Sequence, residues 1–302
     1  MKVLIVGLGS IALKHINAIR KIDSNATIYA LRSSLKAETV DRVINVFSLN
    51  EVLSLDVDFI IIATPTALHK EAIQSLLILN KPLFIEKPVY HKIDIEDIII
   101  QIRERGIETY VACNLRFLDS LQFVASTIKE RVIQEINCYC GSYLPDWRNT
   151  ENFRLSYSAQ SELGGGVHLD LIHELDYLYW LLGKPNVSDK LLKSSSSLQI
   201  DAIDYANYRL IYKSFVANVV LNYYRRDAKR IFEIVFEDET WVVDILANHI
   251  FANGKLIFES SQKVIDTYYD QMTYFYNCVQ SKTPSFNTIE DGINVLKICI
   301  GA

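Results

Sequence analysis

Short apolar strand patterns alternate with helix patterns through the first part of this chain, and this alternation limits the possible folds more than any other feature. The strand patterns are rich in β-branched residues, as is typical of strands buried on both faces of a parallel sheet. Strands and helices that alternate with short loops predict a doubly wound parallel sheet with right-handed crossovers. The expected strands are Lys2–Gly7, Thr27–Leu31, Asn45–Phe47, Phe59–Ala63, Pro82–Ile85 and Thr109–Cys113, and the expected helices are Ser10–Lys21, Thr66–Leu79 and Ile93–Arg105.

The second half of the chain has a different pattern. Its strand-like runs follow one another closely, which favours an antiparallel sheet with helices on one face. The polar segment Lys184–Ser197 is expected to be a loop or a frayed edge of the sheet. We therefore expect an α/β chain with a doubly wound domain over residues 1–118, an α+β domain with a large, mainly antiparallel open sheet over residues 119–302, and a ligand cleft between them. The expected strands are Val132–Ser142, Tyr205–Tyr212, Val216–Tyr224, Arg230–Phe236 and Thr240–Leu246, and the expected helices are His168–Leu182, Tyr268–Ser281 and Thr288–Cys299.

Composition excludes several classes of protein. Half of the 302 residues are hydrophobic and 22% are charged, which is unlike a disordered chain. The net charge of −5 argues against binding to a nucleic-acid backbone. Apolar runs such as Phe59–Ala63 fall far short of the ~20 residues of a membrane-spanning helix. No small-residue cleavage site follows the first apolar run, so we expect a cytoplasmic protein.

The cysteines give no sign of a metal site or a disulfide. Five are present, and only Cys138 and Cys140 lie close together in the sequence. Alternation along a strand places these two on one face, where small buried thiols are ordinary. Zinc sites usually use cysteines separated by two to four residues, so we expect no metal.

A glycine-rich turn joins the first strand to the first helix. Gly7 permits the tight turn, Gly9 lets the backbone approach a pyrophosphate, and Ala12 allows close packing of helix on strand. The N–H groups at the start of the helix, around Ser10 and Ile11, face the phosphates. Because the motif lies within a strand–helix–strand unit, it predicts dinucleotide binding.

The end of the second strand distinguishes NAD from NADP. NAD sites usually carry Asp or Glu there for the ribose 2′-hydroxyl. This chain has Arg32, Ser33 and Ser34 instead, which match a 2′-phosphate. The alternative is that Arg32 is only a solvated loop residue. The pattern favours NADP over NAD.

Two more motifs follow strands at the same expected sheet edge. Thr64-Pro65-Thr66 lies where open parallel sheets bind ligands, although Thr66 also suits the N-cap of the next helix. Lys87, in Glu86-Lys87-Pro88, can place positive charge beside a reacting oxygen. The alternative is an exposed loop lysine paired with Glu86.

The segment from Gly164 to Asp176 is the richest in chemistry. Three glycines allow a loop to pass close to a ligand, and a helix pattern follows them. Asp170 and His173 are three residues apart, so on a continuous helix they share a face, and His173 suits a general acid or base. The alternative is a structural histidine that only bonds to Asp176.

Taken together, these motifs resemble the Gfo/Idh/MocA oxidoreductases in order and spacing. The motifs that carry the resemblance are Gly7-x-Gly9-x-x-Ala12-x-x-His15, Thr64-Pro65-Thr66-x-x-His69, Glu86-Lys87-Pro88, Asn114-Leu115-Arg116-Phe117, Gly164-Gly165-Gly166-x-x-x-Asp170 and Asp291-Gly292. The resemblance implies a Rossmann domain, a second α/β domain with an open sheet, a nicotinamide cofactor and a sugar substrate. One departure is that family members commonly have Asp-x-x-x-His, whereas this chain has Asp170-x-x-His173.

The resemblance also implies roles for individual residues. Lys87 becomes the catalytic lysine, His173 the acid or base, and Asp170 the group that orients them or the substrate. The substrate side is expected to include Asn114, Arg116, Trp147, Arg148, Arg154 and His173. The cofactor is expected to contact Gly7, Gly9, Ser10, Ile11, Ala12, Arg32, Ser33, Ser34, Thr64, Pro65, Thr66, His69, Glu86 and Lys87.

The segment Gly141–Arg148, with Tyr157-Ser158-Ala159 and Glu162-Leu163-Gly164 downstream, resembles members found in bacterial surface-glycan pathways, including those for sialic-acid-like nonulosonates. Arg116, Arg148 and Arg154 would bind a carboxylate or phosphate of such a substrate. The alternative is that Trp147 and Arg148 only pack a domain interface. We therefore expect an NAD(P)-dependent sugar dehydrogenase or reductase, acting on an anionic sugar and forming a homo-oligomer. The other functions left open are an NADP-sensing regulator without turnover and an NAD-dependent glycosidase that works by redox elimination.

Overall fold

The structure is a computed structural model that describes residues 1–36, 38–147 and 152–301. The chain divides into two units. The first comprises Met1–Asn114 and Tyr268–Leu296, and the second comprises Leu115–Thr267 and Lys297–Ala302.

The first unit contains a six-stranded sheet in the order β3-β2-β1-β4-β5-β6, with every pair of neighbours parallel. This is the strand order of dinucleotide-binding domains, and it confirms the predicted doubly wound fold. The strands are β1 (Lys2–Val6), β2 (Thr27–Leu31), β3 (Val43–Val46), β4 (Phe59–Ile62), β5 (Leu83–Ile85) and β6 (Thr109–Val111). The helices are α1 (Ser10–Ile22), α2 (Leu49–Leu53), α3 (His69–Leu76), α4 (Glu96–Glu104), α9 (Thr267–Ser281) and α10 (Ile289–Ile300), the last of which continues into the second unit.

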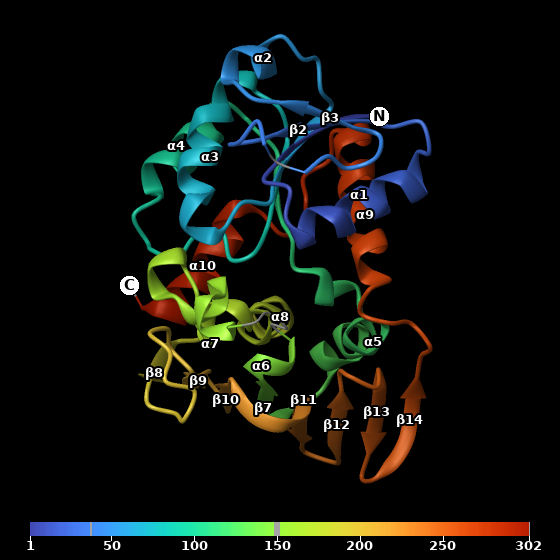
Figure 1. Ribbon diagram of the computed structural model, residues 1–302. Helices are drawn as coiled ribbons and strands as arrows, with labels where there is room; N and C mark the ends of the chain where they lie inside the picture. The colour runs from blue at the N-terminus through green and yellow to red at the C-terminus, as the bar shows by residue number, and fades with distance from the viewer. Residues whose placement is uncertain (37, 148–151, 302) are drawn as a thin grey trace. The chain divides into compact units, whose positions relative to one another are not determined.

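Helices cover both faces of this sheet, which explains its uninterrupted apolar strands. Figure 1 shows α3 and α4 on one side and α1 and α9 on the other. All four residues of β4 are fully buried as a result. Phe275 of α9 packs edge-on against Phe59 of β4, with ring centroids 5.3 Å apart.

The predicted boundary at residue 118 is wrong for the end of the chain, because α9 and most of α10 belong to the first unit. The segment between these helices bonds to strand β6: the Asn287 side chain donates to the Val111 carbonyl at 2.8 Å, and the Ser285 hydroxyl donates to the Thr109 carbonyl at 2.6 Å. Such long-range pairing leaves no local pattern in the sequence. The sequence therefore does not predict that the end of the chain returns to the first unit.

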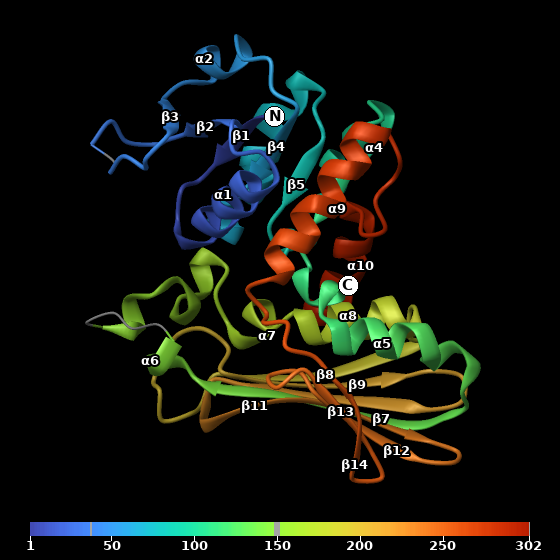
Figure 2. The same cartoon turned by 90° about the vertical axis from the view of Figure 1, so that its right-hand side faces the viewer.

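The second unit is built on an eight-stranded sheet in the order β14-β13-β12-β11-β7-β10-β9-β8. Only β7 and β10 pair in parallel, so the expected mainly antiparallel sheet is confirmed. Figure 2 shows α5, α7 and α8 on the same face of the sheet. The strands are β7 (Ile133–Tyr143), β8 (Val187–Lys193), β9 (Tyr205–Ile211), β10 (Val216–Asn222), β11 (Tyr224–Phe236), β12 (Thr240–Asp244), β13 (His249–Ala252) and β14 (Lys255–Glu259), and the helices are α5 (Asp119–Thr127), α6 (Leu144–Trp147), α7 (Val167–Asp170) and α8 (His173–Leu182).

Of the two alternatives for Lys184–Ser197, the structure has an edge rather than a loop over most of the segment, because strand β8 occupies Val187–Lys193 at the end of the sheet. This edge strand pairs with β9 along its whole length. Six of its seven residues are exposed, so it has no buried face to produce an apolar alternation. Its backbone hydrogen bonds to β9, rather than its side chains, hold it in the sheet.

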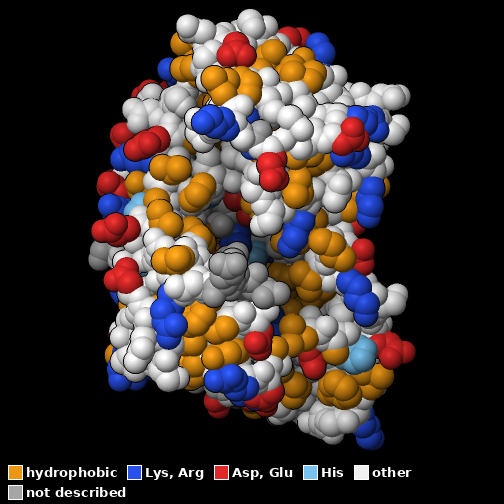
Figure 3. All heavy atoms as spheres, viewed as in Figure 1, with side chains coloured by type: hydrophobic (Ala, Val, Ile, Leu, Met, Phe, Trp, Pro, Cys, Tyr) orange, Lys and Arg blue, Asp and Glu red, His pale blue; other side chains and the backbone are white. Residues whose placement is uncertain are grey.

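Among the described residues, no helix is long and apolar enough to cross a membrane. The face drawn in Figure 3 carries acidic and basic side chains interspersed, with neither sign dominating. A net charge of −5 is therefore not concentrated into one acidic surface on that face.

The packing of α10 gives a direct test of the first unit. A Cβ atom added at Gly292 would lie 2.5 Å from a methyl of Val89 and 2.9 Å from a methyl of Val111. We expect Gly292→Ala to lower the free energy of unfolding by about 1–3 kcal/mol, because overpacking forces the helix away from β6. Urea unfolding followed by circular dichroism measures this. The control Glu290→Ala, which removes a surface ion pair with Arg103, is expected to change stability by less than about 1 kcal/mol. Equal effects of the two substitutions would contradict the packing argument.

Candidate active site

The turn between β1 and α1 is fixed by the neighbouring strand. Gly7 has φ +86°, and a Cβ there would lie 2.7 Å from the Ala63 carbonyl oxygen and 2.8 Å from the Thr64 nitrogen. Only glycine combines this conformation with this closeness. The turn is thereby held directly against the end of β4.

Helix α1 begins with unsatisfied donors. Its N-cap is Gly9, which has no side chain to accept from the first-turn N–H groups around Ser10, Ile11 and Ala12. No described atom lies within 4 Å of the place where a Cβ of Gly9 would stand. Open space in front of free N–H groups at a helix N-terminus fits a pyrophosphate. The residues present therefore fit the phosphates of a dinucleotide.

The Thr64-Pro65-Thr66 turn follows β4 next to the glycine turn, and the two turns together form the cradle proposed for the phosphates. The Thr64 hydroxyl oxygen is buried and has no hydrogen-bond partner within the described part of the chain. His69 supports the turn, because its Nε2 and Nδ1 lie 2.9 Å from the Thr64 carbonyl and 3.1 Å from the Val89 carbonyl. Burial lowers the pKa of His69 below its usual value. We infer that His69, predicted as a cofactor contact, holds the two loops in place.

Glu86 and Lys87 follow β5 at the same edge. The Glu86 carboxylate lies 2.6 Å from Nε2 of His15, and both side chains are buried, which fixes the residue before Lys87. Lys87 is half-buried, and its peptide bond to Pro88 is cis. The Glu86 carboxylate, which the alternative pairs with Lys87, thus has His15 as a partner.

Arg32 follows β2. Its guanidinium donates to the Glu38 carbonyl at 3.1 Å and to the Asn45 side-chain oxygen at 3.4 Å. Ser33 and Ser34 are exposed. Because all six strands are parallel, this loop, the glycine turn, Thr64–Thr66 and Lys87 share the carboxyl edge of one sheet.

In the second unit, the three glycines form a tight support for α7. Gly166 has φ +124°, and a Cβ there would lie 2.7 Å from the imidazole of His168. A Cβ at Gly165 would collide with the Tyr157 carbonyl. The loop therefore packs against backbone on one side and the His168 ring on the other.

The predicted continuous helix over His168–Leu182 is wrong. The chain forms α7 up to Asp170 and α8 from His173, with Leu171 between them at φ −99° and ψ 31°. Asp170 and His173 consequently do not sit on one regular helix face. This break coincides with the spacing that is one residue shorter than in the family pattern.

The Asp170 carboxylate is held by two hydroxyl groups. One of its oxygens, Oδ2, accepts from the Tyr223 hydroxyl at 2.6 Å and from the Ser158 hydroxyl. Trp147 packs against Tyr223, with ring centroids 5.7 Å apart. Sequence reasoning placed Ser158 only within the surface-glycan resemblance and did not single out Tyr223, because the two reach Asp170 across 12 and 53 residues and no spacing rule links them.

Two histidines occupy this region. His173 is buried at the start of α8. His168 is also buried, and its Nδ1 has no hydrogen-bond partner among the residues described. Burial lowers the pKa of His168 to about 4, while the nearby Asp170 charge acts in the opposite direction. His168 is therefore neutral near pH 7.

Three of the predicted substrate residues are buried, namely His173, Arg116 and Asn114. Arg116 is 2% exposed, and its guanidinium pairs with the Asp176 carboxylate at 2.7 and 3.0 Å. Asn114 is 3% exposed. The positive charge of Arg116 is thus offset by Asp176, and we infer that this arginine positions α8.

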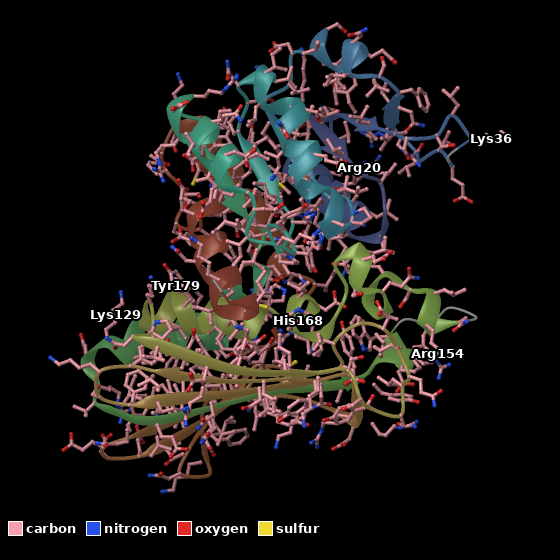
Figure 4. The ribbon with its side chains drawn as sticks, turned by 90° about the vertical axis from the view of Figure 1, so that its left-hand side faces the viewer. Arg20, Lys36, Lys129, Arg154, His168 and Tyr179 are labelled. Atoms are coloured by element: carbon pink, nitrogen blue, oxygen red, sulfur yellow. The ribbon has the colours of Figure 1, made fainter. Side chains whose placement is uncertain are left out.

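Trp147 and Arg154, two further predicted substrate residues, are exposed. Trp147 is 38% exposed. Arg154 donates from Nε to the Leu198 carbonyl at 3.0 Å, and Figure 4 shows it well away from His168. Arg148 lies outside the described residues.

Comparison with known proteins identifies a family. Residues 1–110 match the GFO_IDH_MocA model, described as an oxidoreductase family with an NAD-binding Rossmann fold. Residues 125–224 match the C-terminal alpha/beta domain of the same family. The two matches together cover more than half of the chain.

One curated relative aligns with a little over half of this chain. The chain is 31% identical over 185 residues to the 2,7-anhydro-N-acetylneuraminate hydratase of Escherichia coli (strain K12), covering 60% of this chain and 49% of that protein. The chain thus spans about half the length of this relative.

Solved structures share the fold along nearly the whole chain. Levoglucosan dehydrogenase in complex with NADH and levoglucosan has a TM-score of 0.86 at 17% identity, covering 100% of this chain and 95% of that one. The WlbA dehydrogenase from Bordetella pertussis, in complex with NADH and UDP-GlcNAcA, has a TM-score of 0.81 at 18% identity, covering 99% and 93%. At these identities the likeness shows the fold.

The buried His168 predicts a dependence of stability on pH. Its pKa is lower in the folded chain than the usual 6.5, so the unfolded chain binds more protons between about pH 6.5 and pH 4, and stability falls as the pH falls through this window. Wild-type protein is expected to lose about 2 kcal/mol from this group between pH 7 and pH 4.5, and His168→Gln is expected to lack that part of the loss. Urea unfolding at both pH values measures it, with His249→Gln as the control. Parallel pH profiles of wild type and His168→Gln would contradict the assignment.

Proposed function

Because the chain belongs to the Gfo/Idh/MocA oxidoreductase family, we propose that it transfers hydride between a nicotinamide dinucleotide and a sugar or nucleotide-activated sugar. The observation that carries the proposal is the cradle at the carboxyl edge of the parallel sheet. There the glycine turn, the uncapped start of α1 and the orphaned Thr64 hydroxyl meet. A cradle of this kind suits a dinucleotide.

The chemistry divides between the cofactor and the protein. When bound, the nicotinamide supplies or accepts the hydride. The first-turn N–H groups of α1 bind its phosphates, and Lys87 offers positive charge to the substrate oxygen as alkoxide character develops. His173 takes or gives the hydroxyl proton, and Asp170 orients the substrate or the histidine. These roles follow the family pattern at matching positions of this chain.

The proposed cofactor is NADP in preference to NAD. The loop after β2 offers the Arg32 guanidinium and the hydroxyls of Ser33 and Ser34, and none of these three residues carries the carboxylate that NAD sites usually place on the ribose. Two structural neighbours carry NADH, so this preference is a proposal about this chain alone.

The proposed substrate is an anionic sugar. Trp147 presents an exposed aromatic ring next to Tyr223, whose hydroxyl bonds to Asp170, so an aromatic face and a buried carboxylate lie on one connected set of side chains. Arg154 provides a guanidinium whose Nε is already held. The relative from Escherichia coli, a hydratase of an anhydro sugar acid, supports this class.

The same relative favours a second candidate function. A hydratase of 2,7-anhydro-N-acetylneuraminate adds water to an anhydro sugar, which fits the redox-elimination alternative because the nicotinamide is regenerated in each cycle. The two functions differ in net consumption of cofactor. A dehydrogenase changes the absorbance of the nicotinamide in proportion to product, whereas a redox-neutral enzyme forms product without a lasting change.

We also propose that the chain forms a homo-oligomer, which light scattering would measure.

The role of Lys87 is tested by turnover. We expect Lys87→Ala to lower kcat by about 10²–10⁴-fold, because a charge that stabilises the developing oxyanion is lost. Product formation and nicotinamide absorbance are followed together with a panel of sugars, sugar acids and anhydro sugars. The control Lys92→Ala removes an exposed lysine of the same segment and is expected to retain turnover. Near-normal turnover in Lys87→Ala would overturn the assignment, and product without net cofactor change would select the second function.

The cofactor preference is tested by titration. We expect Arg32→Ala to weaken NADP binding by about 10–100-fold and to leave NAD binding unchanged, because a hydrogen bond from a charged group to the 2′-phosphate is lost. Isothermal titration with each cofactor measures both. The control Arg103→Ala, on the surface of α4, is expected to alter neither affinity. Equal weakening of NAD and NADP, or no weakening, would contradict the preference.

A further inference from the structure

We propose that Tyr223 and Ser158 are positioning residues that set the orientation of the Asp170 carboxylate for its role at the sugar. This inference rests on the proposed function, in which Asp170 orients the reacting groups. Neither residue was predicted as a site residue, and both lie in the second unit with Asp170.

Both hydroxyls converge on a single carboxylate oxygen. The Tyr223 hydroxyl donates to Oδ2 of Asp170 at 2.6 Å, and the Ser158 hydroxyl donates to the same atom. Tyr223 and Ser158 are fully buried, and Asp170 is 9% exposed. Two directed donors on one oxygen fix both the position of that atom and the rotation of the carboxylate about its bond.

The two donors are anchored independently of the helix that carries Asp170. Tyr223 stands between β10 and β11, where its N–H donates to the Asp204 carbonyl at 3.0 Å and its carbonyl accepts from the Leu144 N–H at 2.8 Å. Ser158 lies in the short 3-10 turn Tyr157–Ala159, whose last carbonyl accepts from the Ala202 N–H at 3.2 Å. The two hydroxyls therefore tie the Asp170 carboxylate to the sheet and to a separate turn.

This anchoring matters because the backbone alone does not fix Asp170 firmly. Asp170 ends the four-residue helix α7, directly before the break at Leu171. A side chain at a helix end next to irregular backbone needs external contacts to stay within the narrow geometry that catalysis demands. The hydroxyls of Tyr223 and Ser158 supply such contacts.

The surroundings of Tyr223 keep its hydroxyl protonated and able to donate. Burial and the Asp170 charge raise the pKa of Tyr223 well above its usual value, so its hydroxyl remains protonated and continues to donate at any working pH. The Tyr223 ring also packs against the half-exposed Trp147. Tyr223 thus links the aromatic face proposed for the sugar to the carboxylate.

A buried tyrosine elsewhere in the same sheet provides a matched control. Tyr208 on β9 is also fully buried, and its hydroxyl donates to the Cys299 carbonyl at 3.1 Å. Tyr208→Phe and Tyr223→Phe each delete one buried tyrosine hydroxyl bond of this unit. Only the second of these bonds ends on the Asp170 carboxylate.

The test compares steady-state kinetics of these variants. We expect Tyr223→Phe to lower kcat by about 10–100-fold, with cofactor affinity unchanged, whereas Tyr208→Phe retains kcat. Ser158→Ala is expected to act in the same direction as Tyr223→Phe. In a double-mutant cycle, Tyr223→Phe added to Asp170→Asn is expected to cost little more, since a residue that acts through Asp170 has no effect once the carboxylate is gone.

The outcomes separate this inference from the proposed function. An active wild type with kcat equal in Tyr223→Phe and Tyr208→Phe, or with additive losses in the cycle, overturns the positioning role and leaves the function intact. If no sugar supports turnover, the proposed function fails, and crystal structures of wild type and Tyr223→Phe still decide the positioning role. There the Asp170 carboxylate is expected to rotate in the variant, and an unmoved carboxylate overturns the inference.

Discussion

The close approach of Gly7 to the end of β4 is the constraint on which the cofactor cradle depends. A Cβ at this position would lie 2.7 Å from the Ala63 carbonyl oxygen, so the turn after β1 and the turn after β4 meet backbone to backbone. This contact joins the glycine turn that leads into α1 to the turn that carries Thr64. His69 bonds to the Thr64 carbonyl, and His15 bonds to Glu86 at the next turn. The two histidines thereby support the loops of the edge proposed to bind the cofactor.

The first unit was predictable because its determinants are local. Buried strands such as Phe59–Ile62 appear as unbroken apolar runs, and the glycine turn has a fixed spacing. The return of α9 and α10 was not predictable, since it rests on bonds such as that from Asn287 to Val111 across 176 residues. The sequence left Lys184–Ser197 open between a loop and a frayed edge for a related reason, because an edge strand with six exposed residues carries no periodic signal.

The candidate site in the second unit was predictable only in part. Motif spacing singled out Asp170 and His173, but a continuous helix was assumed and the structure interrupts it at Leu171. The hydroxyls that hold Asp170 come from a turn and from a strand junction, and their pairing arises only once the sheet is assembled. Local positive charge was also overestimated. Arg116 is neutralised by Asp176, so fewer free cations remain for an anionic substrate than the sequence suggested.

Two buried ion pairs hold helix α8 in position. Glu174 pairs with Arg230 of β11 at 2.6 and 3.1 Å, and Asp176 pairs with Arg116 in the same two-pronged way. Buried ion pairs contribute little net stability, because desolvation offsets their attraction, but losing one partner costs about 3–5 kcal/mol. Such pairs therefore select one arrangement of the helix over its alternatives. Glu174 and Asp176 both lie in the first turn of α8, which begins at His173. The helix that carries the proposed acid or base is therefore tied to the sheet through Arg230 and to the turn Asn114–Phe117 through Arg116. Asp170, across the break, lacks this support from α8 and is held by hydroxyl groups from outside its own helix.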